Sequence, residues 1–250
     1  MIAVGSRENC DALCDAHSTV FPTNNLGLRS WYTGCAFERD RKQGTVQISQ
    51  TAYVDQLCER FDVFSSSPLP AAPQEKIFPR QENEATRSDR YRELIGVLRW
   101  VANMTSPDIS NAIRARARFS HDPSEVHWHG ALKILRYLRG TRTLGIMYRK
   151  GMGQELYVFA DLSHAGDFYD RRSVSGGAMI FGRAAVSWFS KTQRTVALST
   201  SEAEYMAMGE SDKELLFVRN VLYFMQPKYG VPSVYVLEIT VVQLTLLKTP

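Results

Sequence analysis

The residues best suited by type and spacing to bind a ligand are the basic side chains between Arg114 and Lys150. Residues 101–150 carry nine Lys and Arg against three Asp and Glu, a net charge of +6, whereas the other 200 residues sum to −2. A basic segment in a near-neutral chain is typical of a nucleic-acid backbone contact. A solvated helix face gives the same pattern, so both interpretations stay open.

One helix is expected to carry much of this charge. The run Asp122-Pro123-Ser124-Glu125 has the pattern of an N-cap with a capping box, and Gly140 stands where a left-handed C-terminal cap is expected. Apolar residues at three- and four-residue steps predict one buried face, made of Trp128, Ala131, Leu132, Leu135 and Leu138. The candidate nucleic-acid-binding residues lie outside it: Lys133, Arg136, Arg139 and Arg142.

Other ionisable residues give weaker signals on their own. His127 and His129 are two residues apart and face different directions on a helix, so they make a poor metal pair. Asp161 ends a predicted strand and Glu204 falls in the run Ser201-Glu202-Ala203-Glu204, which resembles a capping box. Taken alone, these two acids are interpreted as a turn residue and a capping residue.

The elements that must position these residues change type along the chain. The first six residues have the pattern of a buried strand; a helix is expected over 7–20, a hairpin over 31–40 and 45–49, and a helix over 51–61. A Pro- and Ser-rich linker over 65–84 precedes helices at 87–104 and 107–119 and the basic helix. Strands at 156–161, 173–181 and 185–190, a helix over 201–224 and a strand at 234–242 then predict a layered α/β domain.

Composition excludes several classes of protein. The chain has 250 residues, of which 44% are hydrophobic, and this is enough to build a core. The hydrophobic content together with the low net charge of +4 argues against disorder. No apolar run approaches the roughly 20 residues of a membrane span, and early charges argue against a secretory signal. The four cysteines form no CxxC pair. We therefore expect an intracellular protein, cytoplasmic or nuclear, without a membrane partner.

Five ordered motifs resemble the end of a copia-type retrotransposon Pol polyprotein. Tyr91-Arg92-Glu93-Leu94-Ile95-Gly96-Val97-Leu98 with Ser106-Pro107-Asp108-Ile109 is similar to the family's "YRxxxGxLxY…RPDI", and the run from His127 to Thr141 to "HWxxxxRxLRYLKGT". Residues 160–176 are similar to "SDADWAGDxxDRRSTSG", residues 187–193 to "SWxSKKQ", and residues 201–205 to "SxTEAEY". Several blocks at family spacing are far more specific than one short pattern.

The resemblance implies a reverse transcriptase followed by an RNase H domain. Residues 1–64 would be a remnant of the polymerase palm and the start of the thumb, 65–86 a linker, 87–150 the basic helical thumb and connection, and 155–250 a truncated RNase H-like mixed sheet with helix. The thumb and connection of such enzymes lie on the template-primer backbone. The implied partners are an RNA–DNA hybrid or duplex and the rest of a Pol polyprotein.

The resemblance also implies a metal site. Asp161 matches the family's first RNase H acid and Glu204 the second, as ligands of Mg²⁺ or Mn²⁺. Two such ions activate a water and stabilise the leaving oxygen during hydrolysis of the RNA strand. Ile239 stands at the position of the third acid, the fourth would lie beyond residue 250, and the polymerase "YVDD" would precede Met1.

Three functions follow from these matches and departures. The first, which we favour, is a retroelement-derived fragment with little or no catalysis. The second is a nucleic-acid-binding module that uses Lys133, Arg136, Arg139 and Arg142. The third is a working RNase H that takes its missing ligands from a partner chain.

Overall fold

A computed structural model describes residues 7–22, 27–28, 30–72, 75–86, 88–163 and 170–238. The strand predicted for residues 1–6 lies outside this part of the chain, as does the end of the strand predicted over 234–242. Within these ranges no helix combines the length and apolarity that a membrane crossing requires.

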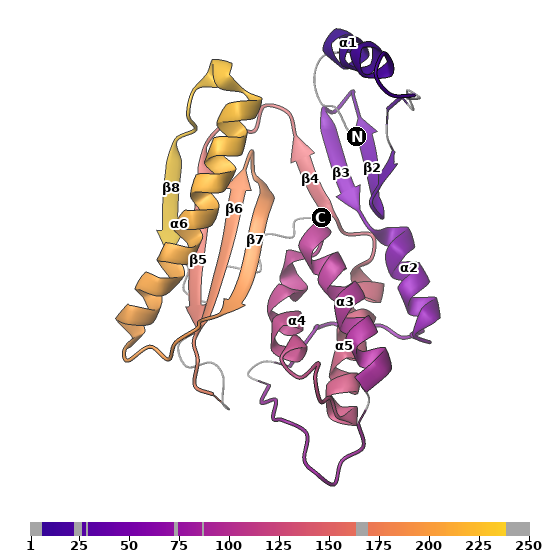
Figure 1. Cartoon of the computed structure of the whole chain (residues 1–250), viewed down its shortest axis with the longest axis vertical. Coiled ribbons are helices and arrows are strands. Elements are labelled where there is room, and N and C mark those ends of the chain that lie inside the picture. The colour runs from indigo at the N-terminus through magenta and orange to yellow at the C-terminus, as the bar shows by residue number, and fades with distance from the viewer. Residues whose placement is uncertain are drawn as a thin grey trace.

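A four-stranded antiparallel sheet follows the first helix, α1 (Arg7–Ser18). Its strands are β1 (Trp31–Tyr32), β2 (Cys35–Asp40), β3 (Thr45–Ser49) and β4 (Ile146–Arg149). The predicted hairpin is confirmed for β2 and β3, which pair from Ala36–Ser49 to Asp40–Thr45, and Gly44 adopts a φ of 65° in its turn. The single strand predicted over 31–40 is wrong, because the chain turns at Thr33 and Gly34 and β1 pairs back on β2. β4 pairs with β3 across the intervening helices, so the chain returns to this sheet after them (Figure 1).

The helices between β3 and β4 form the larger core. They are α2 (Thr51–Arg60), α3 (Ser88–Met104), η1 (Pro107–Ile109), α4 (Ser110–Ala117) and α5 (Glu125–Thr141). The predicted apolar face of α5 is confirmed, since all five of its residues are buried, and they pack with Val54, Tyr91 and Leu98 of the neighbouring helices. Burial of apolar surface is the main driving force for this packing.

Both predicted ends of α5 are wrong by a few residues. The N-cap is Ser124, whose backbone N–H donates to Nδ1 of His127 at 2.9 Å, so His127 replaces Glu as the capping partner. Gly140 lies inside the helix rather than after it. A Cβ at Gly140 would come within 3.3 Å of the Ser66 side chain, so the glycine serves the close approach of the predicted linker.

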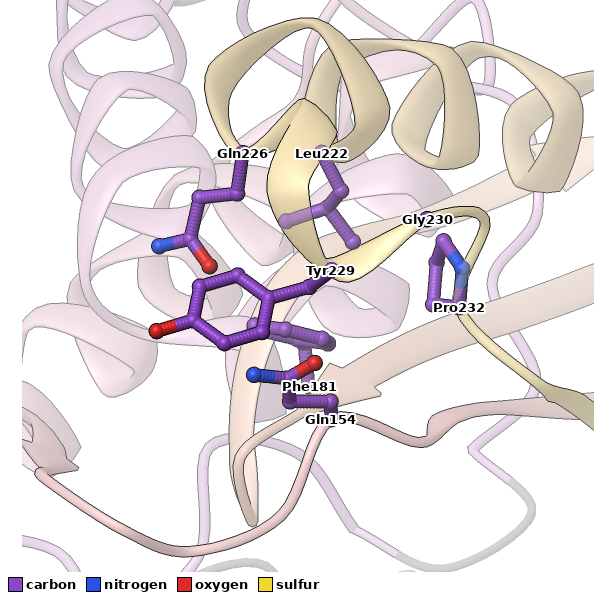
Figure 2. A pocket seen from close by; sticks show the side chains of 7 residues that line it. All are labelled: Gln154, Phe181, Leu222, Gln226, Tyr229, Gly230 and Pro232. Carbon is purple, nitrogen blue, oxygen red and sulfur yellow. The ribbon is translucent and has the colours of Figure 1, made fainter.

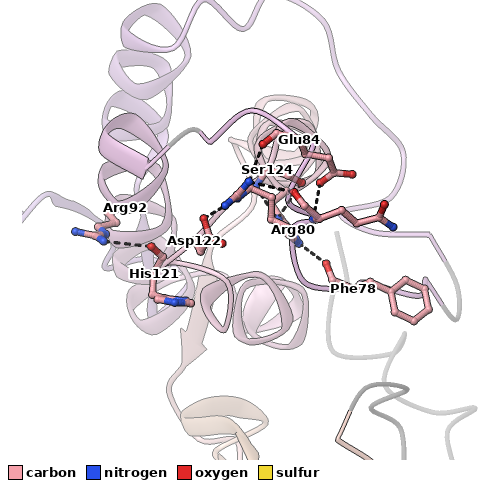
Figure 3. A network of polar contacts seen from close by, with 9 residues as sticks. Phe78, Arg80, Glu84, Arg92, His121, Asp122 and Ser124 are labelled. Atoms are coloured by element: carbon pink, nitrogen blue, oxygen red, sulfur yellow. Dashed lines mark hydrogen bonds and ion pairs between the residues drawn. The ribbon is translucent and has the colours of Figure 1, made fainter.

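A polar network explains why Asp122 does not cap α5 (Figure 3). Arg80 Nε donates to the Asp122 carboxylate at 2.7 Å, and Arg80 Nη1 donates to the carbonyls of Gln81 and Glu84. His127 Nε2 lies 2.9 Å from the Phe78 carbonyl oxygen. Because Nδ1 accepts from Ser124, the ring is neutral with its proton on Nε2. The Arg80 segment is therefore fixed to the start of α5.

The second sheet has the order β7-β6-β5-β8. Its strands are β5 (Leu156–Ser163), β6 (Val174–Phe181), β7 (Ala184–Thr192) and β8 (Val234–Glu238). The three-strand antiparallel meander is confirmed, and β8 returns parallel to β5 after the long helix α6 (Thr200–Met225) and the short η2 (Pro227–Tyr229). α6 covers one face of this sheet, with Leu215 and Val218 against Leu156 and Val158 (Figure 1). The predicted α/β class is confirmed.

Candidate metal and nucleic-acid site

Asp161 lies near the end of β5, on the sheet face that points away from α6. Side chains alternate along a strand, and Leu156, Val158 and Ala160 are buried on the α6 side. The Asp161 carboxylate accepts a hydrogen bond from the backbone N–H of Leu162 at 2.9 Å. Burial raises the pKa of Asp161 above its usual range, and this hydrogen bond opposes the rise in part. A bound cation would offset the cost of burying this carboxylate.

Glu204 lies in the first turns of α6, and its carboxylate is not used to cap the helix. The N-cap is Ser199, whose hydroxyl accepts from the backbone N–H of Glu202 at 3.1 Å. Glu202 in turn accepts from the backbone N–H of Leu198 at 2.7 Å. The capping box predicted on Ser201 is therefore formed two residues earlier, because Ser199 takes the capping position. This excludes the capping interpretation for Glu204.

A buried glutamine links β6, the strand paired with that of Asp161, to the helix of Glu204. The Gln193 amide nitrogen donates to Ser175 Oγ at 3.0 Å and to the Ala203 carbonyl at 2.9 Å. Ser175 is paired with Leu162, the residue after Asp161, and Ala203 precedes Glu204. Figure 1 shows the same relationship at larger scale, because α6 begins at the end of the sheet where β5 finishes. Both predicted acids therefore lie at one end of this sheet.

The two acids reach this end from different sides of the sheet. Asp161 is on the face away from α6, whereas Glu204 belongs to the helix on the other face, so they can share a cation only around the end of the sheet. Over the described ranges, no three His, Cys, Asp or Glu residues form a group that could hold a metal ion. The β5–β8 register ends with Ala160 opposite Glu238, and Ile239 lies outside the described residues.

The four predicted nucleic-acid-binding residues of the α5 region divide into two pairs. Arg139 Nη1 donates to the Val63 carbonyl at 3.3 Å, and Arg142 forms an ion pair with Asp55 at 3.2 Å. The Arg142–Asp55 pair is almost half exposed on each side, and such pairs contribute little to stability. Lys133 and Arg136 are both partly buried. Arg139 and Arg142 therefore make internal contacts that a phosphate would have to replace.

Sequence reasoning missed the arginines of α4. Arg116 is only 2% exposed and pairs with Glu75 at 2.6 Å, so it is structural. Arg114 instead reaches the second sheet, where Nη1 donates to Thr192 Oγ1 at 2.7 Å. Burial lowers the pKa of Arg114 to about 10, which still leaves it charged at neutral pH. The charge count over 101–150 included these residues, but spacing alone did not separate them.

A shallow pocket at the other end of α6 is not part of this site. Figure 2 shows it among Gln154, Phe181, Leu222, Gln226, Tyr229, Gly230 and Pro232. These residues include no acid, Lys, Arg or His that could bind a metal or a phosphate. They lie near the C-terminal end of α6, whereas Glu204 is near its start.

Comparisons with known proteins agree with the motifs. The retrovirus-related Pol polyprotein from transposon TNT 1-94 of Nicotiana tabacum is 33% identical over 213 residues, which are 82% of this chain and 16% of that protein. The Pol polyprotein from transposon RE1 of Arabidopsis thaliana is 33% identical over 187 residues, 74% of this chain and 13% of that protein. Secreted RxLR effector protein 161 of Plasmopara viticola is 37% identical over 128 residues, 51% of this chain and 90% of that protein. No family model and no solved structure matches.

The Pol relatives define a protein derived from a retrotransposon. The chain belongs to the copia-type, retrovirus-related Pol polyproteins of transposons, which confirms the family expected from its motifs. It spans 13% to 16% of the length of these Pol relatives.

Proposed function

We propose that the chain is the reverse transcriptase and RNase H portion of a Pol polyprotein, and that Asp161 and Glu204 belong to an RNase H-type metal site. The reaction is hydrolysis of the RNA strand of an RNA–DNA hybrid. The observation that supports it most is the Gln193 bridge, which ties the strand pair beside Asp161 to the first turn of α6 beside Glu204.

The chain's own residues would hold and orient the cations. Bound Mg²⁺ or Mn²⁺ supplies the chemistry by activating water and stabilising the leaving oxygen. Asp161 suits this role because its carboxylate is partly buried, with a raised pKa that a cation would lower. Glu204 suits it because Glu202 and Ser199 already satisfy the start of the helix.

We further propose that hydrolysis by this chain is weak or absent. Ile239 occupies the position at which the family carries its third acid, and an Ile side chain offers no oxygen to a cation. Hard cations such as Mg²⁺ need oxygen ligands, so the loss of one carboxylate from a shared site lowers affinity.

A cleavage assay tests this function. A hybrid labelled on its RNA strand is incubated with Mg²⁺ or Mn²⁺ and either the wild-type chain or Ile239→Asp, with the same RNA as a single strand as the control. We expect Ile239→Asp to cleave the hybrid faster than the wild type. Adding Asp161→Asn or Glu204→Gln to Ile239→Asp should abolish the gain. Cleavage that persists without either acid, or no cleavage by any variant, contradicts the proposal.

The charge distribution favours a second function, nucleic-acid binding without catalysis. Residues 101–150 carry the +6 excess, and the partly buried Lys133 and Arg136 belong to this segment together with Arg139 and Arg142. Binding should weaken steeply with salt if these side chains neutralise phosphates. Substituting Arg136 and Arg139 by Ala should lower hybrid affinity, and unchanged affinity would contradict this function.

A further inference from the structure

Three residues form one row across the second sheet, on the face away from α6. Asp161 of β5 pairs with Gly176 of β6, and Gly176 pairs with Ser190 of β7. Paired residues of neighbouring strands point to the same face. The row therefore runs from the candidate metal ligand, over a position without a side chain, to a hydroxyl.

Gly176 has room for a side chain on this face of the sheet. A Cβ built on this glycine has its nearest neighbours at 3.8 to 4.0 Å, and they are atoms of Asp161 and the Phe189 carbonyl oxygen. All of these atoms belong to the sheet itself. The backbone does not require glycine here, because Gly176 is not among the residues with positive φ. The glycine therefore leaves space for one side chain between Asp161 and Ser190 on this face, and we call this part of the sheet the floor.

Helix α4 borders this floor at the Ser190 end. Ser190 Oγ lies 3.5 Å from Asn111 Oδ1, and Arg114 donates to the same Asn111 oxygen at 3.0 and 3.2 Å. Figure 1 shows α4 beside β7, the strand that carries both Ser190 and Thr192.

The Arg114 charge has only neutral hydrogen-bond partners in the described part of the chain. They are Asn111 Oδ1 and Thr192 Oγ1. The negative charge of Asp170 raises the pKa of Arg114 from a longer distance, and Asp170 itself forms ion pairs with Arg118 and Arg172. A partly buried cation without a bonded carboxylate is suited to an anionic ligand.

We propose that Asn111, Arg114 and Ser190 bind a backbone phosphate of an RNA–DNA hybrid whose strand lies over Gly176. Strands are about 4.8 Å apart, so two steps from β5 to β7 cover about 10 Å. One strand of a duplex carries a phosphate for about every 3.4 Å of helix axis, so this phosphate is a different one from that at Asp161. The placement beside a cleavage site rests on the proposed function, whereas the binding itself does not require catalysis.

Metal-free binding of a labelled hybrid tests the proposal. Anisotropy is measured in EDTA over a range of salt concentrations for the wild type, Arg114→Gln, Arg114→Lys and Gly176→Val. Arg183→Gln, in the β6–β7 turn, is the charge control, and Gly209→Ala, in open space on α6, is the glycine control. Thermal melting of each variant reports whether it is folded.

We expect Arg114→Gln to weaken binding and to flatten the slope of log affinity against log salt by about 1. Arg114→Lys should keep the wild-type slope, because it keeps the charge. Gly176→Val should weaken binding by about tenfold with little change in melting temperature, since it fills the floor. Neither control should change binding.

Three results would overturn the proposal. The first is that Arg114→Gln and Gly176→Val both bind the hybrid with wild-type affinity. The second is that Arg114→Gln leaves the salt slope unchanged. The third is that the wild-type chain shows no saturable binding of the hybrid. If Arg114 has only a structural role, Arg114→Gln will leave the salt slope unchanged. Because no metal is present, this test can succeed when the cleavage assay fails, and the two proposals are judged separately.

Discussion

The side-chain amide nitrogen of Gln193 lies 2.9 Å from the main-chain oxygen of Ala203, and both residues are buried. The same nitrogen also donates to Ser175 Oγ at 3.0 Å. One side chain therefore fixes the first turn of α6 to the strand beside β5. This contact holds the start of α6, which carries Glu204, against the sheet that carries Asp161.

Gln193→Ala should destabilise the second sheet and its helix. It leaves the buried Ser175 hydroxyl and the Ala203 carbonyl without this donor, which costs about 1 to 3 kcal/mol. Urea unfolding measures the loss. The control is Lys191→Ala near the end of β7, because it removes only an exposed ion pair with Glu210 at 3.3 Å and a cation–π contact with the Phe189 ring, and it should cost less than about 1 kcal/mol. Equal costs for the two variants would contradict the role given to Gln193.

Gly130→Ala should destabilise the helical region. A Cβ at Gly130 would come within 2.6 Å of three guanidinium atoms of Arg116, which is buried and paired with Glu75. Displacing such a side chain costs about 1 to 3 kcal/mol. The matched control is Gly96→Ala in α3, where nothing lies within 4 Å of the new methyl group and a gain of about 0.5 to 1 kcal/mol is expected. Thermal or urea unfolding compares the stability of the two variants. A gain of stability in both Gly130→Ala and Gly96→Ala would be evidence against a fixed Arg116 side chain.

Stability of the helical region should fall below pH 6.5 through His127. Burial lowers the pKa of this imidazole, and its hydrogen bond to the Phe78 carbonyl opposes the effect in part. The folded-state pKa is below the unfolded value of 6.5, so the unfolded chain binds the proton more tightly. The stabilisation is complete above pH 6.5 and is lost as the pH falls through the folded pKa. Melting temperatures between pH 7.5 and 5 measure it.

His127→Gln is the comparison for this pH dependence. Gln cannot titrate in this range, so the variant should be less stable at pH 7 but should lose less stability on acidification than the wild type. If the melting temperature of His127→Gln falls with pH as steeply as that of the wild type, the pH dependence comes from other groups.

Local patterns predicted most elements, but they missed β4, the break between β1 and β2 and the ends of helices. The β2–β3 hairpin and the buried face of α5 follow from periodicity alone. Asp122 was expected to cap α5, but Arg80, 42 residues earlier, binds its carboxylate and leaves the cap to Ser124. Long-range contacts of this kind are not encoded in spacing.

The candidate site was predictable to a similar extent. Motif similarity selected Asp161 and Glu204, but not the faces of the sheet on which they lie. Nor could spacing show that Arg114 would meet Thr192, 78 residues later, across two packed elements. The capping role of Glu202 depended on whether Ser199 or Ser201 starts the helix, and both have the pattern of an N-cap.

Asp161→Asn should raise the melting temperature in the absence of metal. Burial raises the folded-state pKa of this carboxyl, so its ionised form at neutral pH is a cost that an amide avoids. The amide oxygen can still accept the hydrogen bond from the Leu162 N–H. A melting temperature at or below that of the wild type in EDTA would contradict this account of the carboxylate.

The change of melting temperature with Mn²⁺ concentration tests most directly whether Asp161 and Glu204 serve one cation site. A ligand that binds only the folded state stabilises it in proportion to the logarithm of its concentration once the site is filled. We expect a rise for the wild type and for Glu202→Gln, which removes a neighbouring acid with a capping role. We expect no rise for Asp161→Asn or Glu204→Gln. An equal rise in all four proteins, or none in the wild type, would contradict one shared site.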